Sequence, residues 1–305
     1  MEVLNPFALP GRWYKGNLHT HTTGSDGTLD ANAVAARYRE AGYDFLALTD
    51  HDAITSLECG RECESFLVLL GAEISARREN GQHADVLCFG LSEAAPVPER
   101  PTAEAAAEWA RQAGGECLIA HPHLSQITPE ELCSWPGALG IEVFNASCHY
   151  AFGKGYSCAL WDTVLSRGQP AWGFASDDSH HHFNDHRPDD LCQAWVSVRA
   201  PRLGRTALLG ALRRGHFYSS WGPAIEALEV TDDRVKVRTS PVKVINFLAP
   251  GFAGESFTAV AKTTITEAEY RLRGSESYLR IECWDAAGRG AWSNPVISSD
   301  AGTKK

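Results

Sequence analysis

Residues 30–52 read DANAVAARYREAGYDFLALTDHD and contain the pattern on which the fold assignment rests. Asp30 is a typical N-cap residue for the stretch that follows it, and Gly42 is a typical helix terminator. The apolar run FLALT at 45–49 has the length of a β-strand and ends in polar residues. A helix followed by a buried strand is the repeating unit of α/β proteins.

The same unit recurs over roughly the first two thirds of the chain. Strand-length apolar runs occur at 45–49, 66–72, 84–90, 117–120, 140–144 and 171–176. Helix signals lie between several of them, including a capping-box sequence that begins at Thr128 and a stretch from Thr206 to Gly215. Continuous apolar strands alternating with helices predict a parallel sheet that is covered on its faces. About seven such units favour a distorted, TIM-like β/α barrel over an open sheet, although periodicity alone does not require closure.

The pattern changes after Gly222 and Pro223. Apolar and polar residues then alternate with a period of two, in segments at 234–240, 243–249 and 277–285. This alternation indicates antiparallel strands with one solvated face. We therefore expect an α/β domain at 1–222 and a small antiparallel β-sheet or sandwich domain at 223–305.

Composition excludes several classes of protein. The 305 residues carry a formal net charge of −10, which argues against a nucleic-acid binder with a basic stripe. The longest apolar stretch, at 66–72, is far shorter than the roughly 20 residues of a membrane span. The N-terminus lacks the charge pattern of a signal peptide, and the nine cysteines show no paired spacing. These features predict a cytoplasmic protein with reduced thiols and no membrane partner.

Histidines and acids recur next to the ends of the apolar runs. His19 and His21 are two residues apart in LHTH, which puts both imidazoles on the same face of a strand. Further side chains of this kind follow at Asp26, His51, Glu73, His83, His121, Asp178 and His180. A single histidine at such a place is ordinarily no ligand, but chance poorly explains six histidines and three acids together. In a parallel barrel the carboxyl ends of the strands meet at one mouth, where active sites lie.

Imidazole and carboxylate groups in this arrangement predict a metal centre. No cysteine occupies these positions, so a structural zinc–thiolate site is not expected. Mixed nitrogen and oxygen ligands suit Zn²⁺, Mn²⁺ or Fe, and the sequence does not choose among these metals. Nine ligands are too many for one ion and sufficient for two or three divalent ions.

The order of these motifs resembles a known family. The succession HTH, D, TDH, E, H, AHP and DDSH, within residues 13–220, is similar to the PHP (polymerase and histidinol phosphatase) metal-dependent hydrolases. The resemblance implies a distorted seven-stranded barrel that holds a trinuclear metal cluster and cleaves phosphoesters. The segment YLRIECWDAAGRGAWSNPV at 278–296 resembles the C-terminal region of a CehA/McbA-like subgroup.

The resemblance also assigns the nine ligands to three ions. It implies a first ion bound by His19, His21, Glu73 and Asp178, a second bound by Glu73, His83 and His121, and a third bound by Asp26, His51 and His180. Glu73 would then bridge two ions. The D-x-H spacing to His180 favours Asp178 over the neighbouring Asp177 as the ligand.

Other side chains have a functional and a structural interpretation, and both stay open here. His123 could transfer a proton to the leaving group or only cap a turn. Arg187 and Lys154 are candidates for binding a phosphate, because that dianion attracts cations, but each could equally be solvated surface. Asp50 could orient His51 or cap a turn.

Together these residues predict a metal-dependent hydrolase. A hydroxide that bridges two ions would attack the phosphorus of a small phosphate mono- or diester. The acidic surface disfavours long polyanions as substrates. The same hydroxide could attack the carbonyl of a carbamate, ester or amide, which is the alternative function. A catalytically inert, metal-stabilised scaffold is a third interpretation, which the complete ligand set disfavours.

Overall fold

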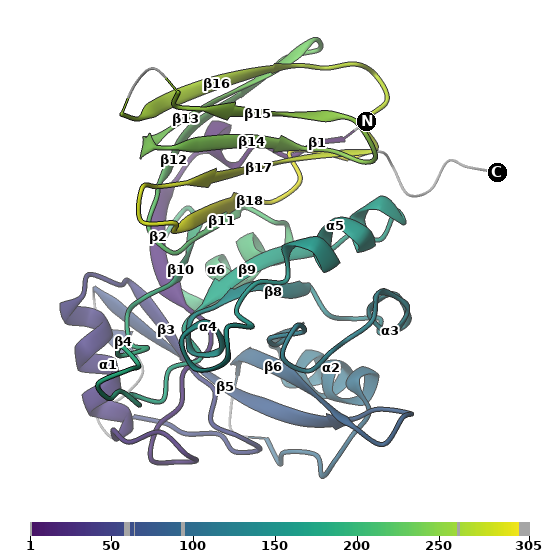
Figure 1. Cartoon of the computed structure of the whole chain (residues 1–305). Coiled ribbons are helices and arrows are strands. Elements are labelled where there is room, and N and C mark those ends of the chain that lie inside the picture. Colours follow the sequence, from purple (N-terminus) through teal and green to yellow (C-terminus); the bar gives the residue numbers. More distant parts are fainter. Residues whose placement is uncertain (1, 58–61, 64, 93–94, 261–262, 299–305) are drawn as a thin grey trace.

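The computed structural model describes residues 2–57, 62–63, 65–92, 95–260 and 263–298. Its main element is a large mixed β-sheet that continues from the α/β part into the C-terminal strands (Figure 1). In spatial order, the strands of the α/β part are β11 (Phe217–Ser220), β10 (Trp195–Ala200), β2 (Arg12–Asn17), β3 (Phe45–Leu48), β5 (Phe66–Arg77), β6 (His83–Leu91), β7 (Glu116–Ile119), β8 (Gly140–Asn145) and β9 (Trp172–Ser176). The short β4 (Glu62–Cys63) pairs with β5.

The helices of the described ranges are α1 (Ala31–Glu40), α2 (Ala103–Gln112), α3 (Pro129–Ser134), α4 (Ala146–Phe152), α5 (Cys158–Ser166) and α6 (Arg205–Arg213), with a 3₁₀ turn at Pro6–Ala8. The predicted caps are confirmed for two of them. The Asp30 side chain accepts a hydrogen bond from Ala33 N at the start of α1, and Thr128 and Glu131 form a reciprocal capping box on α3. No helix in this part of the chain is long and apolar enough to cross a membrane.

The expectation of a wholly parallel sheet is wrong at its centre. β2, β3 and β5 are parallel, and so are β7, β8 and β9, but β6 runs antiparallel to both of its neighbours. Only residues 78–82 connect β5 to β6. A link of that length forms a hairpin, because a parallel crossover needs about a dozen residues or more.

The sheet curls, and β9 approaches the strands at its other end. The Ser219 hydroxyl of β11 donates to Gly173 O and accepts from Ala175 N, both on β9. Thr20, just after β2, forms an isolated parallel bridge with Ser179. Over the described residues no strand ladder joins β9 to β2 or β10, so the sheet is barrel-like without a closed hydrogen-bonded ring.

The C-terminal region is antiparallel throughout, as its alternating pattern predicts. One sheet contains β12 (Ile225–Val230), β13 (Arg234–Val242) and β16 (Ile265–Arg271). It packs on strands of the large sheet, namely β14 (Val244–Leu248), β15 (Gly254–Thr258), β17 (Tyr278–Trp284) and β18 (Gly290–Ser293). The large sheet continues beyond β17 into β19 (Ile297–Ser298) and β1 (Glu2–Val3). In Figure 1 these strands stack above the α/β part.

Strand pairing connects the two parts of the molecule. β18 pairs with β11, so the large sheet crosses the proposed boundary near residue 223, and β1 at the N-terminus pairs with β19. The fully buried Arg280 of β17 also donates two hydrogen bonds, of 2.7 and 2.6 Å, to Asp162 of α5. The C-terminal strands are thus fixed against the α/β part by both backbone and charge-assisted bonds.

Candidate metal centre

Acids and histidines from distant segments gather at one side of the curled sheet. Three sets of these side chains have ligand atoms within 4.8 Å of one another and could each hold a metal ion. They are the buried group (His19, His21, Glu73 and Asp178), the bridged group (Glu73, Asp85 and His121) and the open group (His21, Asp26, His51 and His180). Because Glu73 and His21 each belong to two groups, the three form one continuous cluster.

The buried group has the dimensions of a metal site. The Nε2 atoms of His19 and His21 lie 3.1 Å apart, and each is 3.1 Å from Asp178 Oδ1 and 3.2 Å from Glu73 Oε2. A point equidistant from four atoms at that spacing is about 2 Å from each of them, which is the length of a zinc–ligand bond. Glu73 Oε2 is buried and accepts no hydrogen bond from the described residues. An orphaned carboxylate oxygen surrounded by imidazole nitrogens fits a divalent cation.

Two extended segments hold the ligands of the buried group face to face. The segment after β2 and the segment after β9 are joined by the bridge between Thr20 and Ser179. Backbone bonds on either side run from Asp178 N to His19 O at 3.0 Å and from His21 N to Ser179 O at 2.9 Å. This pairing brings His19 and His21 of the first segment next to Asp178 of the second.

Two ligands sit in a strained backbone conformation. Asp178 has φ = 54° and His121 has φ = 25°, in the left-handed region that residues other than glycine seldom adopt. Such conformations cost about 1–3 kcal/mol each and cluster at functional sites. The position of these two side chains is thus achieved at the cost of an unfavourable backbone conformation.

Glu142, which was not among the residues predicted from the sequence, orients two of the histidines. Its buried carboxylate on β8 accepts hydrogen bonds from His19 Nδ1 and His121 N, both at 2.7 Å, from Asn145 Nδ2 at 2.8 Å, and from the Ser176 hydroxyl. Because Nδ1 of His19 donates to Glu142, the lone pair of its Nε2 faces the buried group. A signal was present, since GIEVF places one acid inside an apolar strand, where a buried charge needs partners.

The bridged group differs from the expectation at one residue. His83 is exposed and pairs with Arg77, four residues beyond Glu73, so the structure does not bring it to the cluster. The physical reason is that β5 continues past Glu73, and the hairpin carries His83 about 13 Å further along the strand. Asp85 takes the expected place instead: His121 Nε2 lies 3.0 Å from Glu73 Oε1 and 4.0 Å from Asp85 Oδ2.

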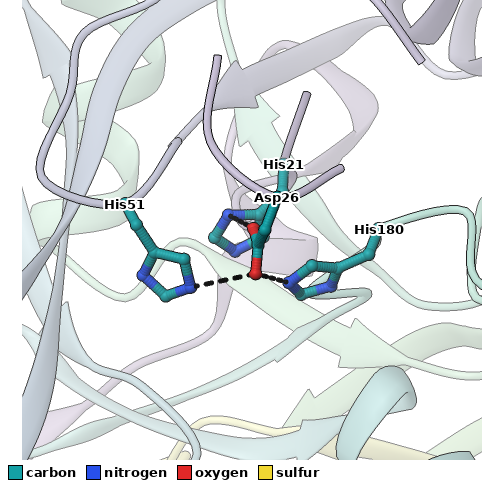
Figure 2. A group of neighbouring side chains, drawn as sticks. All are labelled: His21, Asp26, His51 and His180. Atoms are coloured by element: carbon teal, nitrogen blue, oxygen red, sulfur yellow. Dashed lines mark ion pairs between the residues drawn. The ribbon is translucent and has the colours of Figure 1, made fainter. Parts of the chain in front are cut away.

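The open group surrounds the carboxylate of Asp26 (Figure 2). Asp26 Oδ2 lies 3.3 Å from His180 Nε2 and 3.7 Å from His51 Nε2, and Oδ1 lies 3.5 Å from His21 Nδ1. The side chains of Asp26 and His51 are 53% and 38% exposed, whereas those of the buried group are at most 8% exposed. The ligand atoms of the open group are thus further apart, and its side chains are more exposed to solvent, than those of the buried group.

Asp50 fixes the loop that carries Asp26. Its carboxylate accepts hydrogen bonds of 2.7 Å from the backbone and hydroxyl of Thr22 and from the hydroxyl of Ser25. Burial alone would raise the pKa of Asp50, but these bonds and one from Thr55 lower it. The contacts of Asp50 are therefore those of a residue that caps a turn. They stabilise the loop that carries Asp26.

Without cations, protons balance the charge of the cluster. Burial alone would lower the pKa of His21, but the neighbouring carboxylates of Asp178 and Glu73 raise it to about 9. His121 behaves in the same way, since its bond to Glu73 raises its pKa to about 9 against the effect of burial. Burial would also raise the pKa of Glu73, yet the neighbouring His19 holds it well below its usual range. The acids thus remain ionised and attract positive charge.

A cavity of about 290 Å³ opens onto the three groups. Besides ligands of these groups, its lining contains Leu124, Ser147, Cys148, Phe152, His182 and Arg187. Arg187 Nη2 donates to Ser147 Oγ at 2.8 Å and to Asp190 Oδ2 at 2.9 Å, while its Nε has no hydrogen-bond partner among the described residues. The cavity therefore combines a cation-attracting floor with one fixed guanidinium in its wall.

The other two residues predicted to act on substrate lie elsewhere. The ring of His123 is exposed, and its Nδ1 lies 3.0 Å from the carbonyl oxygen of Tyr156. Lys154 follows the end of α4, and its backbone N–H donates to Cys148 O. Among the described residues that line the cavity, neither His123 nor Lys154 is included. Of the three predicted substrate-binding side chains, the structure thus brings Arg187 to the site.

Comparisons with known proteins bear on the fold. The chain matches no family model. Over 93% of its length it superposes on 94% of a two-domain protein from Bacteroides vulgatus that contains a predicted PHP-like metal-dependent phosphoesterase, with a TM-score of 0.51 and 16% identity. The fold is PHP-like.

A curated relative matches a short part of the sequence. The chain is 36% identical over 85 residues to phosphoribosyl 1,2-cyclic phosphate 1,2-diphosphodiesterase of Eggerthella lenta. The match covers 27% of this chain and 32% of the relative. The chain thus spans about a third of the length of the curated relative it matches.

Proposed function

We propose that this chain is a metal-dependent phosphoesterase that hydrolyses small phosphate mono- or diesters. The observation that carries the proposal is the carboxylate of Glu73, whose two oxygens belong to two different ligand groups. Its Oε2 is an orphaned acceptor 3.2 Å from three imidazoles, and its Oε1 lies 3.0 Å from His121. A carboxylate placed in this way is suited to bridging two cations. The PHP-like fold and the diphosphodiesterase relative support phosphorus as the site of attack.

The residues present fit two or three divalent ions. The buried group would hold one, the bridged group a second, and the open group a third, with Zn, Mn and Fe all compatible with the donor set. Such ions, when bound, acidify water and neutralise the charge that develops on a phosphoryl group. The strands β2, β3 and β5 to β9 would form the distorted seven-stranded barrel that surrounds them.

The chain's own side chains bind and orient the substrate. Arg187, held by Ser147 and Asp190, presents its remaining N–H groups to a phosphate oxygen and is better placed for this than Lys154. His182 is the better candidate to protonate the leaving oxygen, because it lines the cavity. His123 is less suited, because its Nδ1 faces the carbonyl oxygen of Tyr156. Cys148 and Leu124 exclude water from the remaining wall.

Metal analysis and a substrate panel test the proposal together. The purified protein is expected to contain two or three transition-metal ions per chain and to hydrolyse p-nitrophenyl phosphate or bis(p-nitrophenyl) phosphate, with chelation abolishing turnover. Hydrolysis of an aryl carbamate or carboxylic ester without any phosphoester turnover would establish the alternative function. Failure to bind or respond to Mn²⁺, Zn²⁺ or Fe²⁺ would overturn the proposal.

A further inference from the structure

One exposed aromatic side chain lines the metal cavity. The exposed large apolar side chains of the described residues are Phe152, Phe183, Phe252 and Val260. Phe152 is 64% exposed and, unlike the other three, forms part of the cavity lining together with Leu124. Water is a poor environment for an aromatic ring, so Phe152 can gain from covering an apolar group that enters the cavity.

The helix α4 sets Phe152 at a fixed distance from the metal ligands. Cys148 and Phe152 are four residues apart and lie on the same helix face, about 6 Å from each other along the axis. Cys148 Sγ is 3.8 Å from Asp178 Oδ2, and the N-cap residue Asn145 donates to the same oxygen at 3.2 Å. The first turn of α4 therefore touches a ligand of the buried group, and its last residue is Phe152.

The turn after α4 has a well-defined backbone. Gly153 ends the helix in the left-handed conformation, with φ = 68°, and its N–H bonds back to His149 O at 3.1 Å. Gly155 then passes so close to the helix start that a Cβ there would lie 2.6 Å from Asn145 O. The chain after α4 thus folds back onto the start of the helix, and Phe152 is the last helical residue before this turn.

The lining of the cavity contains both polar and apolar side chains. Ionisable ligand groups and Arg187 surround the place for a phosphate, while Phe152 and Leu124 contribute carbon surface. A volume of about 290 Å³ is at the lower limit for a small-molecule site and suits a phosphate with one ring system rather than a long chain. A cavity of this size with both kinds of lining can accept a substrate that combines a phosphate with an apolar group.

We propose that Phe152, with Leu124, forms a specificity subsite for a planar aromatic group attached to the phosphate of the substrate. The aromatic group stacks on the Phe152 ring while the phosphate lies at the metal ligands and Arg187. This inference rests on the proposed phosphoesterase function and adds the chemistry of the ester group. An aryl phosphate and a nucleoside monophosphate both carry such a ring, and the test distinguishes them.

Steady-state kinetics of wild type and Phe152→Ala test the subsite. The substrates are phenyl phosphate, adenosine 5′-monophosphate and glycerol 1-phosphate, and each variant is compared with wild type on the same substrate. We expect Phe152→Ala to raise KM at least about fivefold for an aromatic substrate and to leave glycerol 1-phosphate within twofold, as expected for a lost stacking contact. Phe152→Trp should retain the aromatic preference. A fivefold effect with phenyl phosphate alone assigns an aryl ester, and one with the nucleotide assigns a nucleobase.

A matched variant and a binding measurement separate the outcomes. Phe183, 60% exposed and outside the described cavity lining, is the control, and Phe183→Ala should leave all three KM values unchanged. In calorimetric titration of metal-loaded protein, phenylphosphonate should bind at least fivefold more tightly than methylphosphonate, and Phe152→Ala should remove the difference. If the protein hydrolyses phosphoesters but Phe152→Ala changes no aromatic preference, the subsite is wrong and the proposed function stands. If it neither hydrolyses a phosphoester nor binds a phosphonate, the proposed function itself fails.

Discussion

The buried group and the open group share His21 and yet differ in exposure and spacing. In the buried group the ligand atoms are 3.1–3.2 Å apart and no side chain is more than 8% exposed. In the open group the separations from Asp26 are 3.3–3.7 Å, and Asp26 is 53% exposed. One group is therefore organised before any ion arrives, and the other must tighten around its ion.

The difference follows from what supports each ligand. Glu142 and the paired backbone segments hold His19 and Asp178, whereas Asp26 lies on a loop that Asp50 fixes through its neighbours Thr22 and Ser25. A preorganised site loses little conformational entropy on binding. We therefore expect the buried and bridged groups to retain their ions in conditions where the open group exchanges its ion with solvent.

Replacing Glu73 by Gln should have the largest effect, because it removes the carboxylate that both inner groups share. We expect activity to fall by 10²- to 10³-fold, the scale of losing one preorganised electrostatic group, and metal content to fall by about two ions per chain. The exposed Glu79→Gln is the matched control. Retention of both inner ions by Glu73→Gln would contradict the bridging role.

The metal-free protein should lose stability as the pH rises from about 6.5 to 9. His21 and His121 have folded-state pKa values of about 9, above the unfolded value, so folding favours their protonated forms. Their contribution is complete below pH 6.5 and disappears as the pH passes 9, with a loss of about 1.4 kcal/mol per histidine for each pH unit in that interval. Thermal unfolding in chelator should show this decline, and metal-loaded protein should not. An equal decline in both would mean that cations do not replace these protons.

Replacing Glu142 by Gln tests the support of the buried group without altering a ligand. The amide keeps the shape but places an NH₂ group against donors such as His19 Nδ1 or His121 N. We expect metal affinity to fall by 10- to 100-fold, as for other groups that orient metal-bound histidines. Competition with a fluorescent chelator measures this affinity, and an unchanged value would show that Glu142 does not support the metal ligands.

Asp26→Asn should affect the open group alone. The variant is expected to bind one ion fewer per chain and to lose about 10-fold in activity, while the inner ions remain. Element analysis after extensive dialysis checks the count. Loss of all ions from Asp26→Asn would show that the open group is no weaker than the buried group.

The smallest effect is expected for a substitution of His83. The family resemblance assigns this residue as a metal ligand, whereas the structure places Asp85 there instead. His83→Asn should leave metal content and turnover within twofold of wild type, because its side chain is exposed opposite Arg77. Asp85→Asn should weaken the bridged group by about 10-fold. If His83→Asn weakens metal binding more than Asp85→Asn in metal titrations, His83 rather than Asp85 is the ligand.

The residues of the metal centre differ in how far the sequence alone predicted them. The spacings H-x-H and D-x-H indicated His19, His21 and Asp178, because a period of two fixes which strand residues share a face. Asp85 was missed because strand length is not encoded locally: β5 continues four residues past Glu73 and displaces His83. Glu142 was missed because its partners come from the segments after β2 and β7 and from β9, and only the folded chain brings them together.

The fold shows the same division between local and distant information. Helix caps at Asp30 and Thr128 depend on a few neighbouring residues and were predictable. The antiparallel β6 and the pairing of β18 with β11 depend on contacts between distant segments, which periodicity does not report. The structural similarity to the Bacteroides vulgatus protein at 16% identity shows that very different sequences can adopt this architecture.

Anomalous X-ray diffraction from crystals grown with Mn²⁺ or Zn²⁺, recorded on both sides of the metal's absorption edge, tests the central claim most directly. The account predicts one peak within bonding distance of Glu73 Oε2, His19 Nε2 and His21 Nε2, and a second near Glu73 Oε1 and His121. Peaks confined to surface histidines, with Glu73 left without a metal neighbour, would contradict it.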